Sequence, residues 1–296
     1  ISMNANDYAR SWYSCDEVAG DLELRYFNID RDKQSIIPFI RAAQKYNPEL
    51  TFWTSPWCPP SWMKITGDYP VLSSKFNHMP EKMNYILYGN VNDKVDPDEM
   101  KLVGRRGDKF PRQLATTDYF IQDPRYLQAY ANYFCKFIDA YKEQGVNIDM
   151  VIYQNEAYSY TPYPGCAWTA EGTVRFNRDY LGPTLRQKHP EVKLYLGTFN
   201  TNRVDYVQKI ASDTKLQEYV SGMAFQWEGR ESLPVLRKEH PEWNYMCSES
   251  ECGRGSFDWG AGEHTFELMN HYLGNGCNEY TFWNFILADN GESPWG

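Results

Sequence analysis

The residues of this chain that are best suited to catalyse a reaction are carboxylic acids that directly follow apolar runs. Glu156 follows the apolar run at 150–153, and Glu249 follows another at 243–247. Two carboxyl groups held across a small gap can cleave a glycosidic bond: one protonates the leaving oxygen, and the other attacks the anomeric carbon or activates water. No Ser-His-Asp pattern or phosphate-binding glycine loop competes with them. We therefore predict that Glu156 and Glu249 form a catalytic pair.

Other acids compete with this pair. Glu251 lies two residues beyond Glu249 and shares its face only if the strand continues that far, because side chains alternate along a strand. Asp7 and Glu228 also stand near the ends of apolar runs. Such surplus acids could bind sugar hydroxyls, or they could be ordinary solvated loop residues.

Seven short apolar runs could position these acids as strands, and helical patterns separate most of them. Their ends lie at Asp7, Trp57, Glu156, Thr198, Trp227, Glu249 and Trp283. Repeated strand-then-helix order with functional residues at strand ends predicts an α/β fold of the (β/α)₈ TIM-barrel type. One strand of eight is not found. We expect it before Ile1. The strands at Ile1–Met3 and Glu279–Phe282 should then either be separated by a one-strand gap or flank a strand from outside this numbering.

Helices are predicted from apolar stripes, caps and breakers. Asp123 before Pro124 is a helix start. Gly182-Pro183 should interrupt a helix that begins after Thr169, with helical character continuing to His189. The expected helices cover 32–46, 123–145, 169–181, 204–210, 232–238 and 264–273. The segment at about 66–117 is polar and irregular, which is typical of a lid, a subsite wall or a small insertion. We expect one catalytic domain over 1–296 that carries this insertion.

Composition excludes several classes of protein. The chain has 296 residues, a net charge of −9 and no apolar run long enough to cross a membrane. The negative charge argues against nucleic acid as a partner. Seven scattered cysteines and five histidines show neither a disulfide framework nor metal-ligand spacing, so we expect no metal site. The chain lacks an initial Met and a signal peptide, and we expect it to be a fragment of a longer protein.

Several motifs together resemble family 30 of the glycoside hydrolases, the glucosylceramidase-like retaining β-glycosidases. The resemblance covers nearly the whole chain apart from the segment near 66–117. It is carried by Gln154-Asn155-Glu156, the loop Ser55-Pro56-Trp57-Cys58-Pro59-Pro60-Ser61-Trp62-Met63-Lys64, Cys247-Ser248-Glu249-Ser250-Glu251-Cys252-Gly253, Ile1-Ser2-Met3-Asn4-Ala5-Asn6-Asp7-Tyr8 and Tyr280-Thr281-Phe282-Trp283-Asn284.

The resemblance implies a role for each matching residue. Glu156 would be the general acid/base and Glu249 the nucleophile, while Asn155 would hold the 2-hydroxyl of the sugar. The residues expected to bind substrate around them are Asp7, Trp57, Trp227 and Trp283. The family pairs its barrel with a β-sandwich side domain, which we do not find in this chain. It needs no cofactor, and it implies a carbohydrate or glycolipid substrate and a secreted or otherwise extracytoplasmic location.

Three departures from the family pattern affect the site. Cys58 stands where a hydroxyl residue is usual, and Ala157 stands where proline is common. Gln226-Trp227-Glu228 replaces the usual His-Trp-Tyr, which leaves open how the nucleophile is hydrogen-bonded and adds a third carboxylate nearby.

The predicted function is retaining hydrolysis of a β-glycoside, such as a β-glucoside, a β-1,6-glucan or a glucosylceramide-like lipid. Two alternatives remain: a carbohydrate-binding barrel without activity, and an inverting hydrolase of similar fold. Because an acid/base must carry a proton when substrate arrives, we expect Glu156 to have the raised pKa of the pair.

Overall fold

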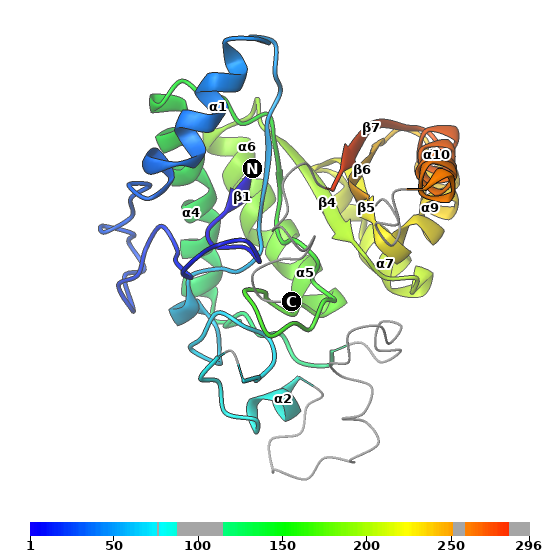
Figure 1. Cartoon of the computed structure of the whole chain (residues 1–296). Helices are drawn as coiled ribbons and strands as arrows, with labels where there is room; N and C mark the ends of the chain where they lie inside the picture. The colour runs from blue at the N-terminus through cyan, green and yellow to red at the C-terminus, as the bar shows by residue number, and fades with distance from the viewer. Residues whose placement is uncertain (76, 88–114, 251–257, 284–296) are drawn as a thin grey trace.

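Seven parallel strands form one open sheet that curves into a half-barrel (Figure 1). The computed structural model describes residues 1–75, 77–87, 115–250 and 258–283. The strands follow one another in chain order across the sheet. They are β1 (Ser2–Met3), β2 (Trp53–Pro56), β3 (Met150–Ile152), β4 (Lys193–Phe199), β5 (Val220–Gln226), β6 (Asn244–Ser250) and β7 (Cys277–Phe282). Within the described residues β1 pairs only with β2 and β7 only with β6, so the edge strands do not pair with each other, as expected.

Helices connect most of the strands and account for the α part of the fold (Figure 1). The α-helices are α1 (Ile36–Gln44), α2 (Met83–Ile86), α4 (Pro124–Glu143), α5 (Ala170–Phe176), α6 (Gly182–Lys188), α7 (Val204–Ala211), α8 (Thr214–Gln217), α9 (Leu233–Glu239) and α10 (Trp259–Gly274). Shorter turns of other helix types are η1 (Asp32–Gln34), η2 (Ser61–Met63), η3 (Asn177–Leu181) and η4 (Trp227–Glu231). Part of the predicted insertion, 76 and 88–114, lies outside the described residues.

Side-chain caps fix where three of these helices begin. The Asp123 carboxylate accepts the backbone N–H of Arg125 at 2.8 Å, which confirms the predicted start of α4. Thr169 caps α5 in the predicted way. Helix α10 begins at Trp259, five residues before the predicted start, because Asp258 accepts the N–H of Ala261 at 3.0 Å.

The predicted interruption at Gly182-Pro183 is wrong, whereas the predicted continuation of the helix to His189 is confirmed, since α6 ends at Lys188. The chain remains helical through η3 and continues directly into α6. Pro183 is tolerated there because it lies in the first turn of α6. Gly182 is needed for another reason: a Cβ at this position would lie 2.6 Å from the ring of Tyr219.

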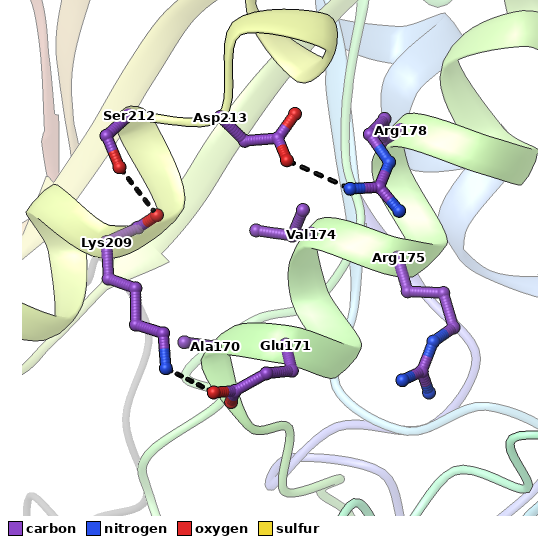
Figure 2. Close-up of a pocket in the computed structure, with 8 residues that line it drawn as sticks. All are labelled: Ala170, Glu171, Val174, Arg175, Arg178, Lys209, Ser212 and Asp213. Carbon is purple, nitrogen blue, oxygen red and sulfur yellow. Dashed lines mark hydrogen bonds and ion pairs between the residues drawn. The ribbon is translucent and has the colours of Figure 1, made fainter.

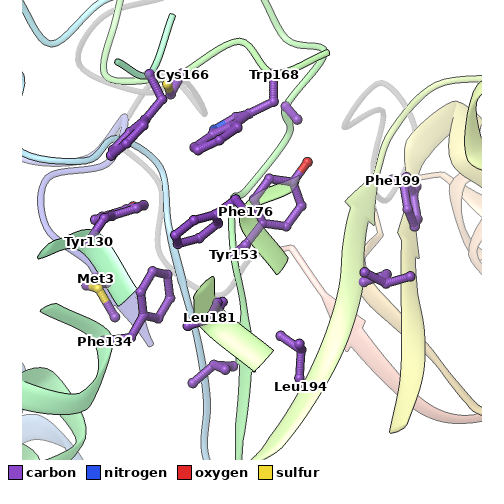
Figure 3. Close-up of a cluster of buried hydrophobic side chains, with 14 of the residues drawn as sticks. Met3, Tyr130, Phe134, Tyr153, Cys166, Trp168, Phe176, Leu181, Leu194 and Phe199 are labelled. Carbon is purple, nitrogen blue, oxygen red and sulfur yellow. The ribbon is translucent and has the colours of Figure 1, made fainter. Parts of the chain in front are cut away.

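The two faces of the sheet carry two apolar cores. On the face that is covered by helices, Val151, Leu194 and Phe225 belong to a large buried cluster. Figure 3 shows Leu194 in this cluster together with Trp168, Phe176 and Tyr130. On the other face, four strands each contribute one side chain to a small cluster, namely Ile152, Tyr195, Ala224 and Met246. One residue from each strand at one level is how a barrel interior is filled. The six cysteines among the described residues are buried free thiols.

Two strands carry one residue more than their neighbours near the carboxyl end of the sheet. In β4, Leu196 pairs with Met223 but Phe199 pairs with Phe225. In β6, Cys247 pairs with Phe225 but Glu249 pairs with Gln226, which leaves Ser248 as the extra residue. Such bulges change which face the following side chains occupy.

Candidate active site

The predicted site residues lie at or just beyond the carboxyl ends of the strands. Glu249 lies within β6, and Trp227 follows β5 directly. The others stand in the loops after β1, β2, β3 and β7, namely Asp7, Trp57, Asn155, Glu156 and Trp283. Because all seven strands are parallel, these ends meet at one rim of the half-barrel.

One side-chain amide joins the two predicted catalytic acids. Nε2 of Gln226 donates to Oε1 of Glu156 at 3.0 Å and to Oε2 of Glu249 at 3.4 Å. The indole Nε1 of Trp227 donates to the other oxygen of Glu249 at 3.1 Å. The structure therefore brings together the carboxyl groups of two residues that are 93 positions apart in the sequence, as the sequence prediction requires.

The bulge in β6 turns Glu249 toward this point. Tyr245 and Cys247 belong to the core under the helices, so strict alternation would place Glu249 on that same outer face. The extra residue, Ser248, reverses the alternation and pairs Glu249 with Gln226. Gln226 lies two residues after Ala224 in β5 and therefore on the same inner face of the sheet.

Backbone and hydroxyl groups hold Glu156 in place. The bulged strand β4 presents the hydroxyl of Thr198, which accepts the N–H of Glu156 at 3.0 Å and donates to Oδ1 of Asn155 at 3.1 Å. Gly197 permits this bulge because a Cβ there would lie 2.4 Å from the carbonyl oxygen of Ala224. Within the described residues, the amide nitrogen of Asn155 is buried and has no acceptor. A donor beside Glu156 is thus available to a ligand.

Unusual backbone conformations collect at the same rim. Glu156 and Trp227 have positive φ angles of 47° and 49°, and Asn4, just after β1, has 68°. A left-handed conformation costs a non-glycine residue free energy and is found preferentially at functional sites. One of these residues, Glu156, is a predicted catalytic acid, and another, Trp227, donates a hydrogen bond to the second predicted acid, Glu249.

Aromatic rings flank the carboxyl groups. The rings of Trp227 and Trp283 meet edge to face with centroids 6.2 Å apart, and Tyr8 packs on Trp283 at 6.3 Å. Elsewhere at the rim, Trp57 lies 5.7 Å from the ring of Tyr163. Such surfaces suit the apolar faces of sugar rings.

The pKa values of three clustered acids are raised. Burial raises the pKa of Asp7 to about 7, and the charge of Glu156 adds to this effect. Burial also raises the pKa of Glu156, although hydrogen bonds from Ser159, Gln226 and Trp227 oppose the rise. Burial and then the charges of Glu156 and Asp7 raise the pKa of Glu249. We expected Glu156 to carry the raised pKa of the pair. Instead the pKa of both acids is raised, and that of Glu249 lies well above its usual value, because the two share one buried space and the charges of Glu156 and Asp7 act on Glu249.

The remaining candidates separate into described and undescribed residues. Glu228 lies in η4 and is half-buried, and among the described residues no hydrogen bond joins it to Glu156 or Glu249. Glu251 lies outside the described residues. Sequence reasoning marked Thr198 as a strand end but gave it no role, and it gave none to Ser248, which directly precedes Glu249.

Two open cavities of about 360 and 540 Å³ lie away from the rim, against α5 and α7. Figure 2 shows the smaller one, where Lys209 pairs with Glu171 and Arg178 pairs with Asp213. In this groove Glu171 and Asp213 each lie beside a basic side chain, whereas the acids at the strand ends lie beside one another. Among the described residues there is no group of three or more potential metal ligands, and no helix there has the length and apolarity to cross a membrane.

Comparisons with known proteins agree with this geometry. The model of the glycosyl hydrolase family 30 TIM-barrel domain matches residues 1–75 and 120–296. The lysosomal acid glucosylceramidase of Mus musculus is 26% identical over 100% of this chain and 53% of its own length. An endo-1,6-β-D-glucanase of Aspergillus fumigatus is 25% identical over 72% of this chain and 37% of its own length.

Solved structures share the fold. The crystal structure of SrfJ from Salmonella typhimurium has a TM-score of 0.75 at 20% identity, covering 100% of this chain and 58% of its own. An endo-β1,6-glucanase has a TM-score of 0.71 at 23% identity, covering 99% and 58%. This chain therefore spans little more than half the length of the glucosylceramidase and of the two solved structures, and the match to the Aspergillus fumigatus glucanase covers 37% of that protein.

Proposed function

This chain belongs to glycosyl hydrolase family 30, and on that premise we propose that it is a retaining β-glycoside hydrolase that uses Glu156 as acid/base and Glu249 as nucleophile. The observation that carries the proposal is the amide of Gln226 between the two carboxyl groups. The sum of its two distances is an upper bound on the separation of the two oxygens it contacts. Two oxygens close enough to share one donor support the ~5–5.5 Å spacing of carboxyl groups in retaining enzymes rather than the ~6.5–9.5 Å of inverting ones, which leave room for a water molecule.

Both acids accept hydrogen bonds, some from the same donors, so we assign their different tasks from the family pattern. Glu249 accepts hydrogen bonds from Trp227 and Gln226, and such bonds favour its carboxylate form, which a nucleophile needs. Like charges this close cannot both ionise easily, so one proton stays in the shared space. We place this proton on Glu156 when substrate arrives.

Two displacements then follow. Glu249 attacks the anomeric carbon while Glu156 gives its proton to the departing oxygen, and a covalent glycosyl ester forms on Glu249. Glu156, now ionised, takes a proton from water, whose oxygen attacks the same carbon and releases Glu249. The buried amide of Asn155 is placed to bind a sugar hydroxyl next to the reacting bond. Trp227 and Trp283 supply the apolar wall for the ring.

We propose a β-glucoside as substrate, with β-1,6-glucan and glucosylceramide-like lipids as the candidates, because the similar curated proteins include a glucosylceramidase and an endo-1,6-β-glucanase. A panel of aryl β-glycosides and these two natural substrates would rank them. An extracytoplasmic location is proposed from the family resemblance alone, and fractionation of the source cells would test it.

Proton NMR of the first-formed product tests the mechanism. The protein made from its complete coding sequence should release the β-anomer first. Release of the α-anomer would show inversion, and sugar binding without release of product would show a binding protein. Glu228→Gln is the matched control, because it removes a nearby carboxyl group that does not bond to the pair, and it should retain activity within a few fold.

A further inference from the structure

Gln226 is the most constrained polar side chain at the rim. It is fully buried, and its carbonyl oxygen accepts the hydroxyl of Ser248 at 2.8 Å. This hydroxyl directs the amide nitrogen toward the acids. An amide nitrogen carries two hydrogens, so it can donate one to Glu156 and the other to Glu249 at the same time.

From this geometry we propose that Gln226 is a positioning residue. Its amide donates one hydrogen bond to each catalytic acid and holds both carboxyl groups in place while protons move during the reaction. The inference rests on the proposed function and assigns a role within the same site. An amide does not titrate near neutral pH, so its donors remain while the proton leaves Glu156 and returns. Each acid therefore keeps its hydrogen bond from Gln226 when the charge of the other acid changes.

Among the described residues, no basic side chain has a hydrogen bond or ion pair with Glu156 or Glu249. The titratable groups near it are Glu156 from the loop after β3, Glu249 from β6 and Asp7 from the loop after β1. From β4, Thr198 contributes only a hydroxyl. Neutral donors act on the pair: Gln226 and the Trp227 indole reach both acids, and Ser159 reaches Glu156. Of these, Gln226 is fully buried and donates to one oxygen of each acid.

Gln226→Leu tests the role by removing both donors while keeping an apolar chain of similar size. A hydrogen bond to a charged group favours the charged form, so its loss should move both limbs of the pH profile of kcat/KM upward by about one pH unit. The value of kcat should fall about 10- to 100-fold, with a smaller change in KM. Gln226→His, which restores the residue usual in the family pattern, should instead move the limbs to lower pH when the imidazole is protonated.

Ser248→Ala provides a second variant in case Gln226→Leu does not fold. It leaves the amide in place but removes the group that orients it, so the limbs should shift in the same direction by a smaller amount. Gln217→Leu is the matched control. Gln217 lies in α8, before β5 and so away from the carboxyl ends of the strands, and its amide donates to the carbonyl of Ala211 at 2.8 Å. This control should leave the pH limbs unchanged.

A readout without turnover separates this inference from the proposed function. Carbon-13 NMR of protein with labelled glutamate carboxyl groups would follow the titration of Glu156 and Glu249, assigned with Glu156→Gln and Glu249→Gln. Upward shifts of both titrations in Gln226→Leu support the inference, even in a chain that hydrolyses nothing. Unmoved titrations and unmoved limbs, with activity lost equally at every pH, would overturn it and show a structural role only.

Discussion

The strand-end site and the groove between α5 and α7 use the same residue types to opposite effect. In the groove, Glu171 pairs with Lys209, and Asp179 pairs with Arg178 at 2.6 Å. These hydrogen bonds lower the pKa of both acids. At the strand ends, Asp7, Glu156 and Glu249 lie among other acids, and burial raises the pKa of all three.

The difference shows why cavity size is a poor guide to function in this molecule. The groove has an open volume of about 360 Å³, but its charges neutralise one another and gain little from a ligand. At the rim, acids that cannot all ionise retain a proton near neutral pH, which is what general acid catalysis needs. We therefore expect substitutions in the two regions to differ in size and in the sign of their pH dependence.

The largest expected effect is that of Glu249→Ala. Loss of the nucleophile removes the covalent step, and kcat should fall by about 10⁴-fold or more. Steady-state kinetics on an aryl β-glucoside would measure it. Near-normal activity here, together with loss of activity in Glu251→Ala, would move the nucleophile to Glu251.

The next effect is that of Glu156→Ala, which should lower kcat on natural substrates by about 10²- to 10⁴-fold. With a good leaving group protonation is no longer needed, and azide should restore turnover by replacing the activated water. The product would be a β-glycosyl azide, detectable by mass spectrometry. Absence of rescue on an activated substrate would argue against the acid/base role.

Asp7→Asn should stabilise the folded protein at alkaline pH. The pKa of Asp7 is raised from 3.8 to about 7 in the folded state, so its contribution is fully favourable below pH 4 and is lost as pH rises through 7. The substitution should therefore raise the free energy of unfolding by about 4 kcal/mol at pH 8 and change it little at pH 4. Urea unfolding at both values of pH would measure this.

Asp179→Asn is the matched comparison in the groove and should show the opposite sign. The lowered pKa of Asp179 gives stability above its unfolded value that is lost as pH falls. Because the pair is partly exposed, the loss at pH 8 should be less than about 1 kcal/mol. A gain in stability at pH 8 would contradict the contrast between the two regions.

The smallest effect should come from Glu171→Gln, which breaks the ion pair with Lys209. Both side chains are largely exposed, so the free energy of unfolding should change by about 0.5 kcal/mol or less. Activity should stay within twofold in the kinetic assay. A tenfold loss would mean that the groove takes part in function.

Much of the fold was predictable because its signals are short. Strand-then-helix order gave the parallel α/β architecture, and the caps at Asp123 and Thr169 marked two helix starts correctly. The break at Gly182-Pro183 was predicted wrongly, since Pro183 fits the first turn of α6. That error arose because a proline reads the same in sequence whether it ends one helix or begins the next.

By itself the sequence determined which acids follow strands, and so it identified Glu156 and Glu249 as a pair. Which way Glu249 points was decided only in the tertiary structure, because it depends on the extra residue Ser248 in the pairing of β6 with both neighbours. The same holds for Gln226, whose two hydrogen-bond acceptors come from β6 and from the loop after β3. Strand register and contacts between segments 23 and 70 residues apart are set by packing of the whole sheet. A short window of sequence does not contain that information.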